Sequence, residues 1–252
     1  MVSNRLLALW QAATSDTPVF PPDKIFNQHW LLGLVLGWFA EQPVVGHSLN
    51  FAPGARWFSG GMIPQPFMKR MGSDKRYDTR IPVDAVVGHF NLSAGDSYTI
   101  SLSPDATQLL VLETRLFETI AEEDASVRLF STSARSIAGL VETLRRARLA
   151  PDQVEKLGFY LLAPQTQIEK GIFPEMARQI IQRQVKHRVD DYAGFQDRWY
   201  EDWFLPAFDH VDVQVVSWES VIAAIKERDS QGAAEIRDFY QACEEYTHPP
   251  AA

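Results

Sequence analysis

The chain has 252 residues, of which 46% are apolar, 24 are lysine or arginine and 32 are aspartate or glutamate. The formal net charge of −8 argues against a constitutive nucleic-acid coat, which would be basic overall, but it leaves room for a local basic cleft. Cys243 is the only cysteine, so no intramolecular disulfide can form and nothing points to a disulfide-stapled secreted fold.

The start of the chain predicts a short amphipathic helix around residues 6–10. The segment MVSNRLLALWQAATSDTP has an arginine before an apolar stretch, as a signal peptide would, but Gln11 interrupts that stretch early. The longest apolar run, residues 30–40, is much shorter than the ~20 residues that cross a bilayer. We therefore expect a cytoplasmic protein without a membrane partner.

A buried helix and then an irregular segment are predicted next. Pro21, Pro22 and Asp23 would open the helix, which is apolar over more than half of its circumference between Ile25 and Phe39. Glycine and proline recur through residues 43–80. The aromatic residues in this segment favour an ordered, packed loop over disorder.

Three strands are predicted in the middle of the chain. They cover residues 83–91, 97–102 and 108–116, with turn residues between them. The LLVL run of the third strand indicates that both of its faces are buried. Consecutive strands joined by short turns predict an antiparallel meander.

The second half of the chain alternates helices with single strands. Ser131 or Ser133 would cap a helix that runs through Leu144, and residues 157–162 would form a buried strand. Pro174 would open a long helix, and Phe195, Trp199 and Trp203 would form a helical stripe that Pro206 limits. A strand at 211–216 and helices at 217–228 and 231–246 would follow. The expected fold class is α/β, with an antiparallel meander and one crossover.

Two carboxylates and an arginine on these strands could carry chemistry. Asp84 lies at the start of the first strand, and Glu113 and Arg115 project from the same face of the third because strand side chains alternate. Asp84 and Glu113 could share a divalent cation, since Mg²⁺ takes carboxylate oxygens together with water and substrate phosphate. The alternative is structural: an aspartate near a turn, and a Glu113–Arg115 pair that neutralises itself.

Other polar features have simpler explanations. The six histidines show no metal-binding spacing, and Trp199 and Trp203 have the spacing of a helix core. A basic loop before the first strand could contact a nucleic-acid backbone or an acidic partner, but a solvated loop is the simpler interpretation. Its cations are Lys69, Arg70, Lys75, Arg76 and Arg80.

Four segments together resemble the PD-(D/E)XK nuclease superfamily, in particular a bacterial branch of it. They read VDAVVGHF, LLVLETRLF, SARSIAGLVE and GFYLLAPQTQIEKGIF. The resemblance covers about residues 23–193. It implies a restriction-endonuclease-like core of a helix, three antiparallel strands, a helix and another strand. One domain over residues 1–252 would then hold this core at about 23–193, with extra helices at both ends and a C-terminal helical extension at about 194–252.

The resemblance also implies a site and an activity. Asp84 and Glu113 would be the two metal-binding acids, holding Mg²⁺ or Mn²⁺, and Arg115 stands in the place of the superfamily's lysine. The implied activity is metal-dependent phosphodiester hydrolysis in DNA or RNA.

Arg115 divides the functional interpretation in two. Guanidinium stays charged in any protein environment, so Arg115 can stabilise charge on a phosphate but cannot act as a general base. The acidic segment 118–128 also follows where a phosphate backbone would need positive charge. The sequence therefore leaves two functions open. One is a metal-dependent nuclease, and the other is a catalytically inactive relative, degenerate at this site, that binds a protein or a nucleic acid.

Overall fold

The computed structural model describes residues 21–42, 44, 46–67, 80–95, 97–116 and 130–247. The expected helix around residues 6–10, the acidic segment 118–128 and four cations of the basic loop lie outside them. Within the described ranges, no helix is both long and apolar enough to cross a membrane.

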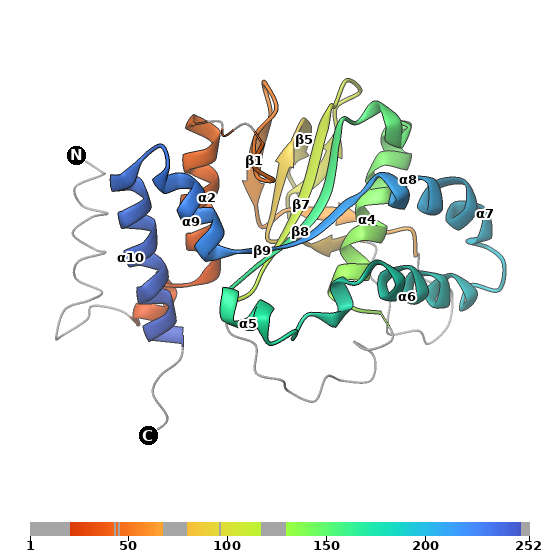
Figure 1. Ribbon diagram of the computed structural model, residues 1–252. Helices are drawn as coiled ribbons and strands as arrows, with labels where there is room; N and C mark the ends of the chain where they lie inside the picture. The colour runs from red at the N-terminus through yellow and green to blue at the C-terminus, as the bar shows by residue number, and fades with distance from the viewer. Residues whose placement is uncertain are drawn as a thin grey trace.

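In the described part of the chain, nine strands form two mixed sheets, which confirms the α/β class (Figure 1). The first sheet has the order β1-β4-β7-β8-β9, with strands Arg56–Ser59, Ala85–Gly88, Gln108–Thr114, Lys156–Ala163 and Asp212–Ser217. The second sheet has the order β3-β2-β6-β5, with strands Arg80–Pro82, Met62–Pro64, Thr99–Leu102 and Phe90–Ser93. In the first sheet, β1, β4 and β7 run antiparallel, and β7, β8 and β9 run parallel.

The predicted antiparallel meander is wrong, because its strands do not all belong to one sheet. The expected strand at 83–91 breaks at His89, so that β4 belongs to one sheet and β5 to the other. Gly88 makes this break: its φ is 148°, and a Cβ there would lie 2.1 Å from the carbonyl oxygen of Gln108. The chain leaves the first sheet, forms the β5–β6 hairpin and returns as β7 directly beside β4. The three antiparallel neighbours are therefore β1, β4 and β7.

Residues 43–80 also differ from the prediction, because β1 and β2 lie in the segment expected to be a loop. Both strands are short, and the intervening Gly60 has a φ of 72°. Glycine and proline dominate the sequence pattern there, although the backbone of β1 pairs with β4 and that of β2 with β3. A segment of three or four residues is too short to show a strand period.

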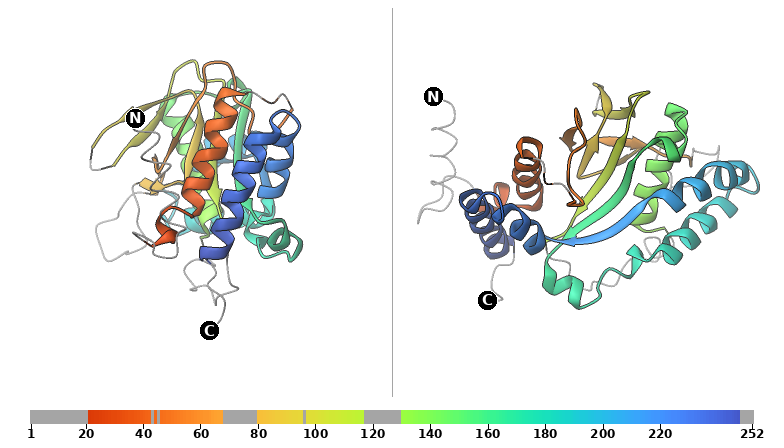
Figure 2. Two further views of the ribbon diagram at one scale, coloured as in Figure 1. Left: turned by 90° about the vertical axis from the view of Figure 1, so that its left-hand side faces the viewer. Right: turned by 45° about the horizontal axis from the view of Figure 1, so that its top comes forward.

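Helices lie on both faces of the first sheet (Figures 1 and 2). The α-helices are α2 Gln28–Glu41, α4 Thr132–Ala147, α5 Gln165–Glu169, α6 Arg178–Asp190, α7 Asp197–Trp199, α8 Leu205–His210, α9 Trp218–Lys226 and α10 Ser230–Thr247. The shorter turns are η1 Pro22–Lys24, η2 Pro151–Gln153, η3 Pro174–Met176 and the π-helical η4 Tyr200–Phe204.

The helix boundaries correct three expectations. The prolines at 21–22 introduce only η1, and α2 begins after Asn27, whose side chain accepts hydrogen bonds from the backbone of His29 and Trp30. Pro174 likewise opens a 3-10 turn, and α6 begins four residues later. Pro206 does not end a helix: it lies in the first turn of α8, where its missing N–H is tolerated.

The first sheet separates two hydrophobic cores. One core holds α4, α6 and the second sheet, and the other holds α2, α9 and α10. Side chains of β7 alternate between them: Leu109 and Val111 lie in the first core, and Leu110 and Leu112 in the second. The prediction that this strand and the strand at 157–162 are buried is confirmed.

Candidate functional site

The pairing of β4 with β7 brings the two predicted carboxylates together. Ala85 lies opposite Leu112 in the antiparallel register. Asp84 immediately precedes Ala85, and Glu113 immediately follows Leu112, so both acids fall at the next opposed position. A meander of the predicted kind would have put another strand between them.

Asp84 is held by three donors. Its Oδ2 accepts hydrogen bonds from the backbone N–H and the hydroxyl of Thr114, both at 2.7 Å, and its Oδ1 lies 3.4 Å from Nε2 of His29. Burial alone would raise the pKa of Asp84, but the hydrogen bonds from His29 and Thr114 outweigh it and hold that pKa below its ordinary value. Asp84 is therefore a carboxylate at neutral pH.

The negative charge of Glu113 is less well compensated by donors than that of Asp84. The residue is only 5% exposed, and its Oε1 accepts one hydrogen bond, from the Ser136 hydroxyl of α4 at 2.9 Å. Burial, and then the negative charge of Asp84, raise the pKa of Glu113 to about 7. Positive charge near Glu113 is thus too weak to offset burial and the neighbouring acid.

Arg115 forms a long ion pair with Glu113. Its Nη1 is 3.9 Å from Oε2 of Glu113 and instead donates to the carbonyl oxygen of Thr114 at 2.8 Å. The backbone of Arg115 is fixed on both sides, since its N–H donates to Leu162 of β8 and its carbonyl accepts from the Trp218 indole at 3.1 Å. The structural alternative was a Glu113–Arg115 pair that neutralises itself. That pair alone does not explain why the Arg115 guanidinium donates to the Thr114 carbonyl and stays 3.9 Å from Glu113.

Three contacts of the site were not predicted from the sequence. The sequence indicated no role for Thr114 or Ser136, and His29 was only one of six histidines without metal-binding spacing. The hydrogen bond to Asp84 raises the pKa of His29 above its ordinary value, although partial burial opposes it. For His29, the local signal in the sequence is Asn27, which caps α2. The cap fixes where α2 begins and therefore places His29 in its first turn.

The donor set fits a hard divalent cation of the kind that uses few protein ligands. In the described part of the chain, no three histidine, cysteine, aspartate or glutamate side chains gather to hold a metal ion. Mg²⁺, however, is usually bound by one or two carboxylates and keeps several waters. The raised pKa of Glu113 beside ionised Asp84 indicates that Glu113 is short of positive charge, which a cation would supply.

The other residues that the sequence analysis considered are not part of this site. Arg80 is the only basic-loop cation among the described residues, and it lies exposed on β3. Trp199 is buried in the first hydrophobic core, as its helical spacing predicted. Burial raises the pKa of the Cys243 thiol to about 12, so this residue is unreactive at neutral pH.

Comparison with known proteins adds no relative: no family model, no curated protein and no solved structure matches the chain.

Proposed function

We propose that the chain is a metal-dependent nuclease of the PD-(D/E)XK type, acting on the phosphodiester bonds of DNA or RNA. The observation that carries the proposal is the antiparallel pairing of β4 with β7, which sets Asp84 beside Glu113 at the paired ends of two inner strands. Two acids from distant parts of the sequence meet there, and one of them is short of positive charge.

The order of elements supports the same proposal. Helix α2, strands β1, β4 and β7, helix α4 and strand β8 occur in this order along the chain. Strands β2 and β3 of the second sheet lie between β1 and β4, and β5 and β6 lie between β4 and β7. Apart from these four strands, this is the order of helix, three antiparallel strands, helix and strand that a restriction-endonuclease-like core requires. The acids lie on the second and third of the three antiparallel strands, at adjacent ends.

The residues of the site would have separate roles. Asp84 and Glu113 would hold Mg²⁺ or Mn²⁺, and the bound cation would polarise the phosphate and lower the pKa of attacking water. Ser136 orients the Glu113 carboxylate by its hydrogen bond, and Thr114 and His29 orient Asp84. Arg115 would stabilise negative charge on the phosphate, because guanidinium presents several N–H donors but releases no proton.

A second function is favoured by Arg115 itself. Its guanidinium donates to the Thr114 carbonyl, and Asp84 Oδ2 already accepts two hydrogen bonds. A relative that has lost the lysine and filled its site in this way would keep the fold as a binding module for a protein or a nucleic acid. For either function we propose a cytoplasmic location, which a sequence with a single cysteine favours.

Cleavage assays separate the two functions. Single-stranded DNA, duplex DNA and RNA are incubated with the protein and Mg²⁺ or Mn²⁺, with Glu113→Gln as the test variant. Glu227→Gln, an exposed residue that follows α9, is the matched control. The nuclease proposal expects cleavage by the wild type and by the control, and none by Glu113→Gln or with a chelator.

The variant Arg115→Lys resolves a negative result. If the wild type is inert and Arg115→Lys cleaves, the protein is the inactive relative of the second function. If neither protein cleaves any substrate, the nuclease proposal is overturned.

A further inference from the structure

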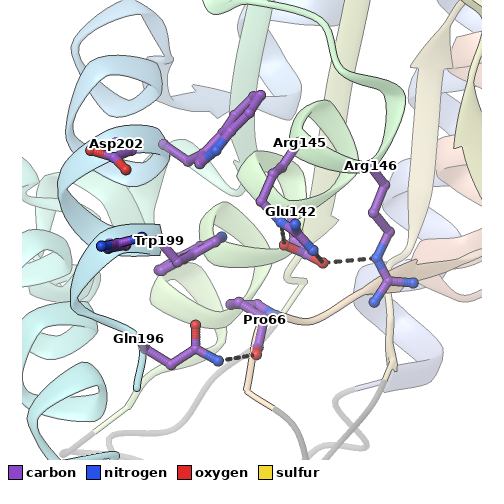
Figure 3. Close-up of a pocket in the computed structure, with 9 residues that line it drawn as sticks. Pro66, Glu142, Arg145, Arg146, Gln196, Trp199 and Asp202 are labelled. Atoms are coloured by element: carbon purple, nitrogen blue, oxygen red, sulfur yellow. Dashed lines mark hydrogen bonds and ion pairs between the residues drawn. The ribbon is translucent and has the colours of Figure 1, made fainter. Parts of the chain in front are cut away.

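A cavity at the far end of α4 has no part in the proposed chemistry. Its volume is about 320 Å³, within the range of roughly 300–1,000 Å³ typical of small-molecule sites. Residues near the C-terminal end of α4 form one wall, and residues 196–203 form the other (Figure 3). Arg146 lies almost three turns beyond Ser136 on α4, about 15 Å along the helix axis. The cavity is thus separate from the Asp84–Glu113 site.

A buried carboxylate holds two arginines in place in this cavity. Glu142 has a side chain only 2% exposed, and it accepts two hydrogen bonds from Arg145, at 2.7 and 2.8 Å, and one from Arg146 at 2.8 Å (Figure 3). The side chains of the two arginines remain 43% and 49% exposed. Within the described chain, Nη1 of Arg145 and both Nη atoms of Arg146 donate no hydrogen bond. These donors are oriented but unused.

The opposite wall adds a third cation and two indole rings. Arg198 is exposed and forms no ion pair with any described residue, and Trp199 and Trp203 line the cavity beside it. With Asp202 and Glu142 counted, the lining carries one positive charge in excess, although the whole chain is acidic. The π-helical turn Tyr200–Phe204 begins between the two tryptophans, and such turns are frequent at functional sites.

We propose that this cavity binds a nucleotide, either free or as one unit of a single strand. Arginine N–H groups in a fixed fork suit phosphate oxygens. The partly exposed indole of Trp203 suits a stacked base, whereas the Trp199 ring is buried against Phe67 and Phe204. Because Glu142 already orders Arg145 and Arg146, binding costs less side-chain entropy than at a pair of mobile surface arginines.

Binding is measured with two probes, adenosine monophosphate by calorimetry and a short, labelled oligothymidylate by fluorescence anisotropy. A chelator is present throughout, so that the result does not depend on whether the protein is a nuclease. The test variants are Arg146→Ala and Trp203→Leu. Arg237→Ala is the control, since Arg237 is exposed on α10, on the other side of the sheet. Thermal melts check that each variant is folded.

We expect each test variant to weaken binding roughly tenfold and the control to leave it unchanged. Binding of the oligonucleotide alone identifies the ligand as a strand, and binding of both probes includes the free nucleotide. The proposal is overturned if neither probe binds, or if binding is the same in folded Arg146→Ala and Trp203→Leu as in the wild type.

Discussion

Two buried glutamates of this protein lie in opposite electrostatic surroundings. Glu142 is 1% exposed and Glu113 is 5% exposed, so burial penalises both carboxylates. Around Glu142, hydrogen bonds from Arg145 and Arg146 outweigh that penalty and lower its pKa. Around Glu113, burial and the charge of Asp84 dominate, and its pKa rises to about 7.

The difference separates a structural carboxylate from a candidate metal ligand. A buried acid with two arginines is satisfied and gains little from a cation. A buried acid beside another acid, with its arginine 3.9 Å away, is the kind of perturbed group that clusters at functional sites. Burial alone does not mark a glutamate as functional, whereas burial without a compensating positive charge makes it a candidate.

The largest expected effect comes from removing the strand pairing that creates the Glu113 surroundings. Gly88→Ala would force a Cβ within 2.1 Å of the Gln108 carbonyl oxygen at a φ of 148°. We expect a loss of more than about 3 kcal/mol of unfolding free energy in urea titrations. Gly37→Ala is the control, since its Cβ would meet nothing within 4 Å inside α2, and it should stabilise by about 0.5–1 kcal/mol. Equal effects at the two glycines would contradict the account of the strand break.

Glu142→Gln tests the compensated member of the pair. Removing the charge leaves Arg145 and Arg146 without their shared carboxylate, and we expect a loss of about 2 kcal/mol at neutral pH. Because the folded-state pKa of Glu142 is lowered, this contribution is present above the unfolded pKa and is lost as pH falls through the folded value. Urea titrations of wild type and variant should therefore converge in acid. A gap that stays constant with pH would rule out the ion pairs as its source.

Glu113→Gln should show the opposite pH dependence. The folded-state pKa of about 7 exceeds the ordinary value of 4.5, so the stability linked to this proton is full below the unfolded pKa and is lost as pH rises through 7. In the presence of a chelator, the wild type should lose about 1–3 kcal/mol relative to Glu113→Gln between about pH 5 and about pH 8. If the stability of the wild type and that of Glu113→Gln change in parallel with pH, the raised pKa of Glu113 is contradicted.

The smallest expected effect is stabilisation by metal. A cation that binds the folded state adds about 1.4 kcal/mol at ten times its dissociation constant. We expect Mn²⁺ to raise the melting temperature of the wild type at about pH 8 by a few degrees, and to leave that of Glu113→Gln nearly unchanged. An equal shift in Glu142→Gln and the wild type would assign the ion to the uncompensated acid.

Local patterns predicted much of the fold. The Ser131 cap of α4 is present, its hydroxyl accepting from the N–H of Ala134 at 3.3 Å. The strand at 211–216 and the two last helices lie within a few residues of their predicted bounds. These elements are long or strongly periodic, so their pattern survives in the sequence.

Pairings between distant segments could not be predicted in the same way. The chain leaves the first sheet at Gly88, forms a hairpin in the second sheet and returns beside β4. No local sequence pattern indicates this path, because the break at Gly88 depends on the close approach of its backbone to Gln108, a residue distant in the sequence. Strand alternation placed Glu113 and Arg115 on one face, whereas a shared Asp84–Glu113 site was a hypothesis that the family resemblance implied and the predicted meander did not support. The contact of His29 with Asp84 was not predicted, since it depends on how α2 crosses the sheet.

Titration of Mn²⁺ into the metal-free protein at about pH 8, followed by calorimetry, tests the central claim most directly. The account predicts one ion per chain, with affinity at least roughly tenfold weaker in Asp84→Asn and in Glu113→Gln and unchanged in Glu227→Gln. Absence of binding, or binding that is indifferent to both acids, would contradict a metal site at the paired ends of β4 and β7.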